Sequence, residues 1–214
     1  MPQIIIDPEQ LGTPNAQLPF TILPDSVRKF GFAPDFRLCK PGDLILFRDR
    51  FPALTSRLIS SAQAKSGFHD DHSCWTHAAV FLYDDFIVEA DLWPGVHTRT
   101  IYKDIPSSVL RVRRRPDLQD IERYQIALPA LRMIGARYGK IGAVRMGFRM
   151  LSGIWDQDKY YLDSPVICSK VFFDAHAEIT RHLLKDCPVS GPVFPAHLSA
   201  TEDLEDIEIP WLRL

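Results

Sequence analysis

The sequence has few cysteines, and no two of them have the spacing of a metal-binding pair. Cys39, Cys74, Cys168 and Cys187 are scattered over 214 residues, without a CxxC motif or a disulfide-dense pattern. Because structural disulfides belong mainly to oxidising compartments, this usage favours a reducing one.

The sequence also lacks an excess of basic charge and a long apolar run. Its 25 basic and 27 acidic residues give a formal net charge of −2, which argues against a dedicated nucleic-acid binder. No window approaches the ~20 apolar residues of a membrane-spanning helix. The first residues have neither the basic start nor the apolar run of a signal peptide, so a cytoplasmic location is the default expectation. Export by another route is left open.

What is present is enough apolar material for one well-filled core, since 46% of the residues are hydrophobic. Residues 1–40 are rich in proline, which predicts an N-terminal arm laid over the domain or partly loose. Residues 41–214 are expected to form a single domain, with a helical insertion at about 117–160.

Short apolar runs and helical periodicity alternate along this domain. Strands are predicted at 44–47, 75–83, 86–90, 95–101 and 109–113. Helices are predicted at 52–63, from 117 with a disturbance at Pro129, at 141–151, and from 168 to about 184. Strands and helices in this arrangement indicate an α+β fold.

Cys168 is the candidate nucleophile. Val171, Phe172 and Ala175 follow it at three- and four-residue steps, which predicts a buried amphipathic helix. Cys168 would lie at or near the first turn, where free amide hydrogens and the helix dipole favour a thiolate. For this residue alone, the alternative is a small core cysteine.

His77 and Glu89 interrupt two apolar strands. His77 precedes the run 78–80, and Glu89 is the only charge in the strand 86–90. The two strands predict an antiparallel hairpin that can bring both side chains together on one face, although they are not directly opposed. Glu89 would orient the imidazole, and His77 would act as the base for Cys168. The alternatives are a structural histidine and an outward-facing glutamate.

Residues 69–77 contain three histidines, two aspartates and a cysteine, all of which zinc accepts as ligands. The spacing of His69, His72, Cys74 and His77 matches no standard closed site. We therefore expect a solvated loop near the cleft, and neither a metal nor another cofactor. A zinc-dependent protein that uses this loop is the alternative.

Tyr138 is the candidate oxyanion donor, because acyl transfer needs a hydrogen-bond donor near the nucleophile. The alternative is a tyrosine at a helix end, since Gly139 follows it.

Two groups of basic residues are interpreted without a catalytic role. The run Arg111–Arg115 is expected to be an exposed strand edge, where charge prevents unwanted pairing. A second group is expected to be a solvated helix face, with a face toward an anionic substrate or membrane as the alternative; it comprises Arg132, Arg137, Lys140, Arg145 and Arg149.

The order of these features resembles the circularly permuted, NlpC-type branch of the papain-like cysteine hydrolases. The matching segments are Pro-Gly-Asp-Leu-Ile-Leu-Phe at 41–47, Thr-His-Ala-Ala-Val at 76–80, Ile-Val-Glu-Ala at 87–90, Ile-Cys-Ser-Lys-Val-Phe at 167–172 and Phe-Pro-Ala-His-Leu at 194–198. In that branch the histidine comes first, then the polar third residue, then the cysteine. The resemblance covers about residues 40–200.

The resemblance implies Cys168 as nucleophile, His77 as general base and acid, and Glu89 as the residue that orients His77. It implies a small antiparallel sheet or half-barrel packed against helices. The implied activity is hydrolysis of an amide, such as a cell-wall peptide, or of an ester.

Two alternatives use the same fold: acyl transfer or lipid-acyl hydrolysis, similar to lecithin:retinol acyltransferase-type enzymes, and an inactive binding module. The expected partner is therefore a peptide, cell-wall or lipid-like acyl substrate, not nucleic acid, and peripheral membrane contact is left open. The proline-rich arm and the insertion depart from the family pattern, so the substrate class stays open.

Overall fold

The central element is an antiparallel sheet. The structure is a computed structural model that describes residues 23, 25–91, 94–136, 168–189 and 192–214. In this part of the chain, six strands are ordered β5-β4-β3-β2-β6-β7. They are β2 (Leu44–Asp49), β3 (His77–Tyr83), β4 (Phe86–Ala90), β5 (Val96–Thr100), β6 (Ser108–Arg114) and β7 (Glu205–Ile207). A separate pair joins β1 (Phe32–Pro34) to β8 (Trp211–Arg213).

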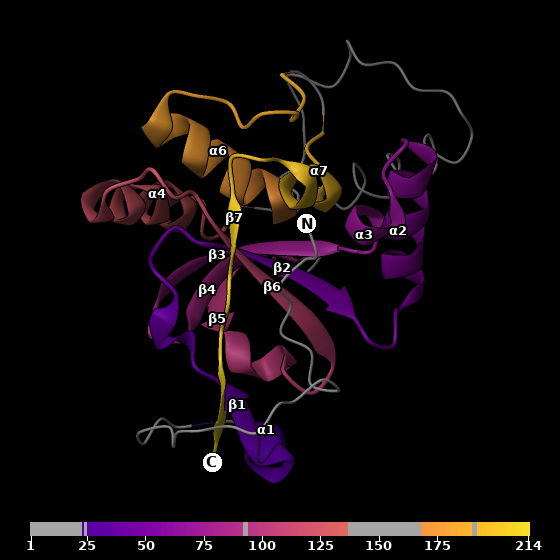
Figure 1. The fold of residues 1–214 in the computed structure, drawn as a ribbon, viewed down its shortest axis with the longest axis vertical. Helices are drawn as coiled ribbons and strands as arrows, with labels where there is room; N and C mark the ends of the chain where they lie inside the picture. The colour runs from indigo at the N-terminus through magenta and orange to yellow at the C-terminus, as the bar shows by residue number, and fades with distance from the viewer. Residues whose placement is uncertain (1–22, 24, 92–93, 137–167, 190–191) are drawn as a thin grey trace.

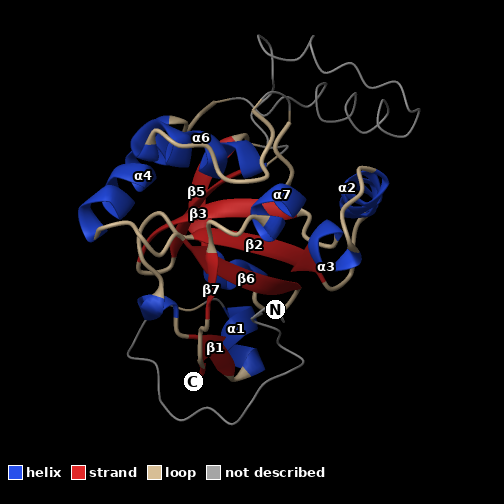
Figure 2. Cartoon of the chain, turned by 45° about the horizontal axis from the view of Figure 1, so that its top comes forward, coloured by secondary structure: helices blue, strands red, loops and turns tan. Residues whose placement is uncertain are grey.

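Helices cover the sheet on both faces. Helices α4 (Asp120–Arg132), α6 (Cys168–Thr180) and α7 (Pro195–Ala200) lie on one side, as Figures 1 and 2 show. Helix α1 (Asp25–Phe30) and the 3-10 turns η2 (Phe36–Leu38) and η3 (Ile101–Asp104) lie on the other. Helices α2 (Leu54–Lys65) and α3 (Asp70–Ser73) stand beyond one end of the sheet. The α+β prediction, with an antiparallel sheet packed against helices, is confirmed.

Period-two alternation along the strands creates two apolar layers. Leu46, Val80 and Val88 face α6, where Phe172 packs against them. Their neighbours on the same strands, such as Ile45, Phe81 and Ile87, face the opposite layer with Phe36 and Ile101. The sheet is therefore buried on both faces, which explains its continuous apolar runs.

The turn before β2 needs a glycine. Gly42 has a φ of +81°, and a Cβ at this position would lie 2.8 Å from the carbonyl oxygen of Arg123 in α4. The next residue, Asp43, is fully buried and accepts from the backbone N–H of Lys40 at 2.7 Å and from Arg114. The tight turn thus joins the start of β2 to α4 and β6.

Two predictions about the strands and helices are wrong. Strand β6 is not an edge, because β7 pairs with it; Arg111 and Arg113 are buried and share Asp206 of β7. Pro129 does not interrupt α4, which continues past it to Arg132. Only the last turn follows this proline, so little of the helix depends on the missing N–H.

The helix predicted at 52–63 forms as α2, but its leucines lie on the surface. Within the described residues, no helix combines the length and the apolar character that crossing a bilayer requires.

Candidate active site

The hairpin of β3 and β4 brings His77 and Glu89 together, as the sequence predicts. Ala79 pairs with Glu89, so His77, two residues earlier on β3, shares a sheet face with Glu89. The Nε2 atom of His77 lies 2.8 Å from Oε2 of Glu89. Glu89 is fully buried, whereas the His77 side chain is 23% exposed, so the imidazole can reach both the carboxylate and a substrate.

Cys168 is the first residue of α6 in the described part of the chain. Its side chain is within hydrogen-bonding reach of His77, and α6 packs directly on β3. Because Nε2 of His77 faces Glu89, the other ring nitrogen, Nδ1, is the one left for Cys168. The three predicted site residues are therefore gathered around one imidazole.

The electrostatics of this group favour a charged imidazole. Burial alone would lower the pKa of His77, but the hydrogen bonds and charges of Cys168 and then of Glu89 outweigh it and hold that pKa well above its usual range. For Glu89, burial raises the pKa, yet hydrogen bonds and charges from His77 and Arg99 dominate and lower it. Glu89 is consequently ionised at neutral pH.

The other cysteines have the opposite environment. Burial raises the pKa of Cys39 and of Cys74, and it raises the pKa of Cys187 to about 12. All four cysteines are free thiols. Cys168, in contrast, lies beside His77.

Arg99 of β5 holds Glu89 from the other side. Its guanidinium contacts both carboxylate oxygens, with Nη2 at 2.8 Å from Oε2, and its Nη1 binds Asp104 of η3. The guanidinium also lies over the ring of Phe47, 5.8 Å from the centroid, and Phe47 packs against the His77 ring. Arg99 therefore fixes Glu89 and keeps it ionised.

Sequence reasoning missed Arg99 and its neighbour His97. His97 pairs directly with Glu89 in the sheet, and its Nε2 lies 3.4 Å from Oε1 of Glu89. The available signal was the alternation of these two basic residues along the strand after Glu89, which places both on one face. The pairing of β5 with β4 is what places both side chains beside Glu89.

The prediction of a solvated loop at residues 69–77 is wrong in part, because Asp70–Ser73 form helix α3 and Trp75 is fully buried. His69 is exposed, His72 is bonded to Ser199 at 2.9 Å, and Cys74 contacts the carbonyl of Asp71. His77, the last member, is on β3 with Glu89. In the described residues, the ligand atoms that lie within 4.8 Å of one another belong to His77, Glu89 and Asp91.

Several predicted residues cannot be placed at the site. Tyr138, the oxyanion candidate, lies outside the described residues, as do Arg137, Lys140, Arg145 and Arg149. Arg132 is on the surface of α4 and forms an ion pair with Glu178 of α6.

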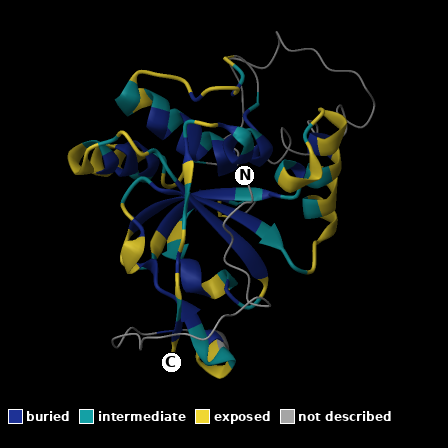
Figure 3. Ribbon diagram, in the orientation of Figure 1, coloured by how far each residue is buried: buried dark blue, intermediate teal, exposed yellow. Residues whose placement is uncertain are grey.

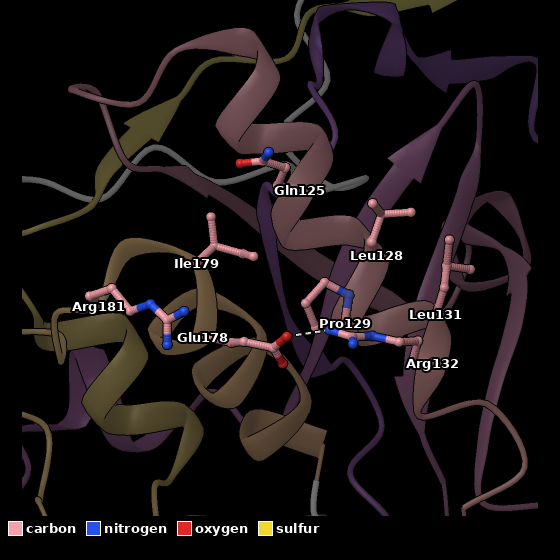
Figure 4. A pocket seen from close by; sticks show the side chains of 8 residues that line it. All are labelled: Gln125, Leu128, Pro129, Leu131, Arg132, Glu178, Ile179 and Arg181. Atoms are coloured by element: carbon pink, nitrogen blue, oxygen red, sulfur yellow. Dashed lines mark hydrogen bonds and ion pairs between the residues drawn. The ribbon is translucent and has the colours of Figure 1, made fainter.

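A pocket of about 720 Å³ lies elsewhere, between α4 and α6. Figure 4 shows Leu128, Pro129 and Ile179 around it, with the Arg132–Glu178 ion pair at its side. Neither Cys168 nor His77 lines this pocket, so it does not belong to the candidate active site.

Comparisons with known proteins agree on the fold only. No family model matches the chain, and no curated protein matches it. Among solved structures, the chain is similar to the metalloprotein yiiX from Escherichia coli O157:H7, described as DUF1105, with a TM-score of 0.55 and 16% sequence identity. The alignment covers 80% of this chain and 98% of that chain.

Proposed function

We propose that this protein is a cysteine hydrolase that cleaves an amide or ester bond through Cys168, His77 and Glu89. The observation that carries the proposal is a single imidazole placed between a thiol at the start of a helix and a buried, ionised carboxylate. A nucleophile, a base and a group that orients the base are the parts that covalent acyl transfer needs.

In the proposed reaction, Cys168 transfers its proton to Nδ1 of His77, and the thiolate attacks the substrate carbonyl. The imidazolium then protonates the leaving amine or alcohol, the C–N or C–O bond breaks, and an acyl thioester remains on Cys168. Water attacks the thioester while His77 accepts its proton, which releases the acid and restores the thiol. The backbone N–H of Cys168 is the proposed oxyanion donor.

Glu89 and Arg99 have positioning roles in this scheme. The Glu89 carboxylate accepts a hydrogen bond from Nε2–H of His77, which holds the ring with Nδ1 toward Cys168 and stabilises the charged imidazole. Arg99 keeps Glu89 ionised and in place. We expect the same arrangement to serve an acyl transferase or a lipid-acyl hydrolase, in which only the acceptor or the acyl group differs.

The activity test uses two series of chromogenic substrates, aminoacyl anilides for amides and acyl esters of different chain lengths. We expect hydrolysis in one series, lost in both Cys168→Ala and His77→Ala and retained in Cys74→Ala. Hydrolysis that survives Cys168→Ala would contradict the proposal. No turnover of either series, with Cys168 labelling that is not elevated and does not depend on His77, would favour an inactive binding module.

A second candidate, a metal-binding protein, is favoured by the grouping of His77, Glu89 and Asp91 and by the description of the similar structure as a metalloprotein. The guanidinium of Arg99 argues against it, because a cation already occupies both oxygens of Glu89. Metal analysis of the purified chain and of Asp91→Ala separates the two. Stoichiometric metal in the first and not in the second would favour the metal-binding function.

A further inference from the structure

Helix α2 displays its large apolar side chains to solvent. Phe51, just before the helix, is 84% exposed, Leu54 is 73% exposed and Leu58 is 37% exposed. Leu54 and Leu58 are four residues apart, which places them on one face of the helix, and Phe51 precedes its first turn. Figure 3 shows this helix largely exposed, at the edge of the molecule.

The buried residues of α2 are the small Ala62 and the polar Gln63, and neither is a large apolar side chain. Gln63 is fully buried; its amide donates to the carbonyls of Ser73 and Trp75 and accepts from the N–H of Ala196. In the first turn of the helix, the hydroxyl of Ser56 donates to the Asp49 carboxylate at 2.5 Å. The leucines of α2 thus face outward, whereas the apolar stripe of an ordinary surface helix faces the core. The described part of the chain does not bury this apolar stripe. The stripe is therefore available to contact a lipid surface or another molecule.

The charge around this stripe is positive. Residues 48–65 include four basic residues, Arg48, Arg50, Arg57 and Lys65, and one acidic residue, Asp49, within a chain of net charge −2. Arg57 and Lys65 are exposed; Arg57 lies one turn after Leu54, beside the leucines, and its Nε donates to the carbonyl of Pro52. The next acids, Asp70 and Asp71, follow the opposite end of the helix. Exposed Phe and Leu beside Arg and Lys are the combination that binds an anionic lipid surface.

The position of α2 relates this surface to the candidate active site. Strand β2 runs antiparallel to β3, with Phe47 paired to His77. Strand β2 ends at Asp49, and Phe51 follows two residues later. The stripe therefore begins at the end of the sheet where His77 lies.

A second exposed apolar stripe, on α4, has acidic residues in its first turn, and its exposed basic residue, Arg132, is paired with Glu178. It contains Ile121, Tyr124 and Leu128, and its first turn carries Asp120 and Glu122. Because acidic residues repel an anionic surface, α4 serves as an internal control for α2.

We propose that the α2 corner, formed by Arg50, Phe51, Leu54, Arg57 and Leu58, docks on the surface of an anionic lipid bilayer. The apolar side chains enter the headgroup region and the basic side chains meet lipid phosphates. This docking requires no chemistry at Cys168, so it does not depend on the proposed hydrolase activity.

The test is flotation of the full chain with vesicles of phosphatidylcholine alone or mixed with phosphatidylglycerol. We expect binding to the mixed vesicles, its reduction at high salt, and a loss of about tenfold or more in Phe51→Ser/Leu54→Ser. Arg57→Glu should weaken binding in the same direction. Leu128→Ser on α4, the matched control, should bind like the unmodified chain, and Cys168→Ala should too.

Three results would overturn the proposal. One is no binding to the mixed vesicles. Another is an equal loss of binding in Leu128→Ser and Phe51→Ser/Leu54→Ser. The third is a dimer in solution, by sedimentation, that Phe51→Ser/Leu54→Ser dissociates, since the stripe would then bind a second copy. Thermal unfolding of each variant shows that the fold is retained; Arg57→Glu provides a second route if the double variant unfolds.

Discussion

The Nε2 atom of His77 and the Oε2 atom of Glu89 lie 2.8 Å apart, on adjacent strands of one hairpin. The carboxylate is fully buried, while the imidazole remains partly accessible. A buried carboxylate is stable only with partners that satisfy its charge, and here His77 and Arg99 supply them. The contact thus stabilises the buried charge of Glu89 and fixes the orientation of the His77 ring.

Replacing Glu89 with glutamine tests this contact. Glu89→Gln keeps an oxygen near Nε2 but removes the charge, so we expect the pKa of His77 to fall. The rate of Cys168 alkylation at neutral pH should fall as well, because a less basic imidazole is a weaker acceptor for the thiol proton. NMR titration of His77 measures the shift, with Glu178→Gln as the surface control. An unchanged titration curve would show that Glu89 does not control the imidazole.

Arg99 is expected to stabilise the fold as well as the site. In Arg99→Met, Glu89 and Asp104 lose their shared cation, and breaking such a buried pair costs about 3–5 kcal/mol of unfolding free energy. Arg99→Lys should recover only part, because one ammonium cannot contact two carboxylate oxygens as a guanidinium does. Urea denaturation measures both.

The matched control for Arg99 is Arg132→Met, which removes a surface ion pair with Glu178. Its cost should stay below about 1 kcal/mol. Equal costs for the two methionine variants would contradict the burial argument.

His176 is expected to make the folded protein less stable in mild acid. Burial first, and then the charge of Arg115, lowers the pKa of His176 to about 4, and its Nε2 has no partner among the described residues. An unfolded histidine titrates near 6.5, so between these values the unfolded chain binds more protons and stability falls as pH falls. The contribution is roughly 2 kcal/mol between about pH 7 and pH 5.

The variant His176→Leu should therefore lose less stability than the unmodified chain over this range, by urea denaturation at both pH values. Near pH 7 it should be as stable or more so, because it removes an unpaired buried nitrogen. Parallel losses of stability in the two proteins would contradict this role of His176.

Local patterns predicted the elements because each pattern has a short-range cause. Alternation along β3 and β4 and the three- and four-residue spacing after Cys168 are visible in the sequence, and they placed His77 and Glu89 on one face. Long-range pairing has no such signal. β7 and β8 have three residues each, and β7 converts the predicted edge of β6 into an interior strand.

The same reason explains the partners that the sequence did not reveal. Arg99 reaches Glu89 because β5 pairs with β4. Arg111 and Arg113 bind Asp206, which lies 95 and 93 residues away in the chain. Leu54 and Leu58 face outward while Gln63 faces inward, and the partners of Gln63 come from α3, from Trp75 before β3 and from α7. Periodicity identifies the face of a helix but not which side of the molecule the face meets.

In the proposed function, His77 activates Cys168 as the nucleophile. The most direct measurement is the rate of chloroacetamide alkylation of each cysteine as a function of pH, resolved by peptide mass spectrometry, in the unmodified chain and in His77→Ala. We predict that at about pH 6 Cys168 reacts faster than Cys39, Cys74 and Cys187, and that His77→Ala abolishes this difference. Labelling of Cys74 with Cys168 unreacted, or a Cys168 rate that is unchanged in His77→Ala, would contradict the claim.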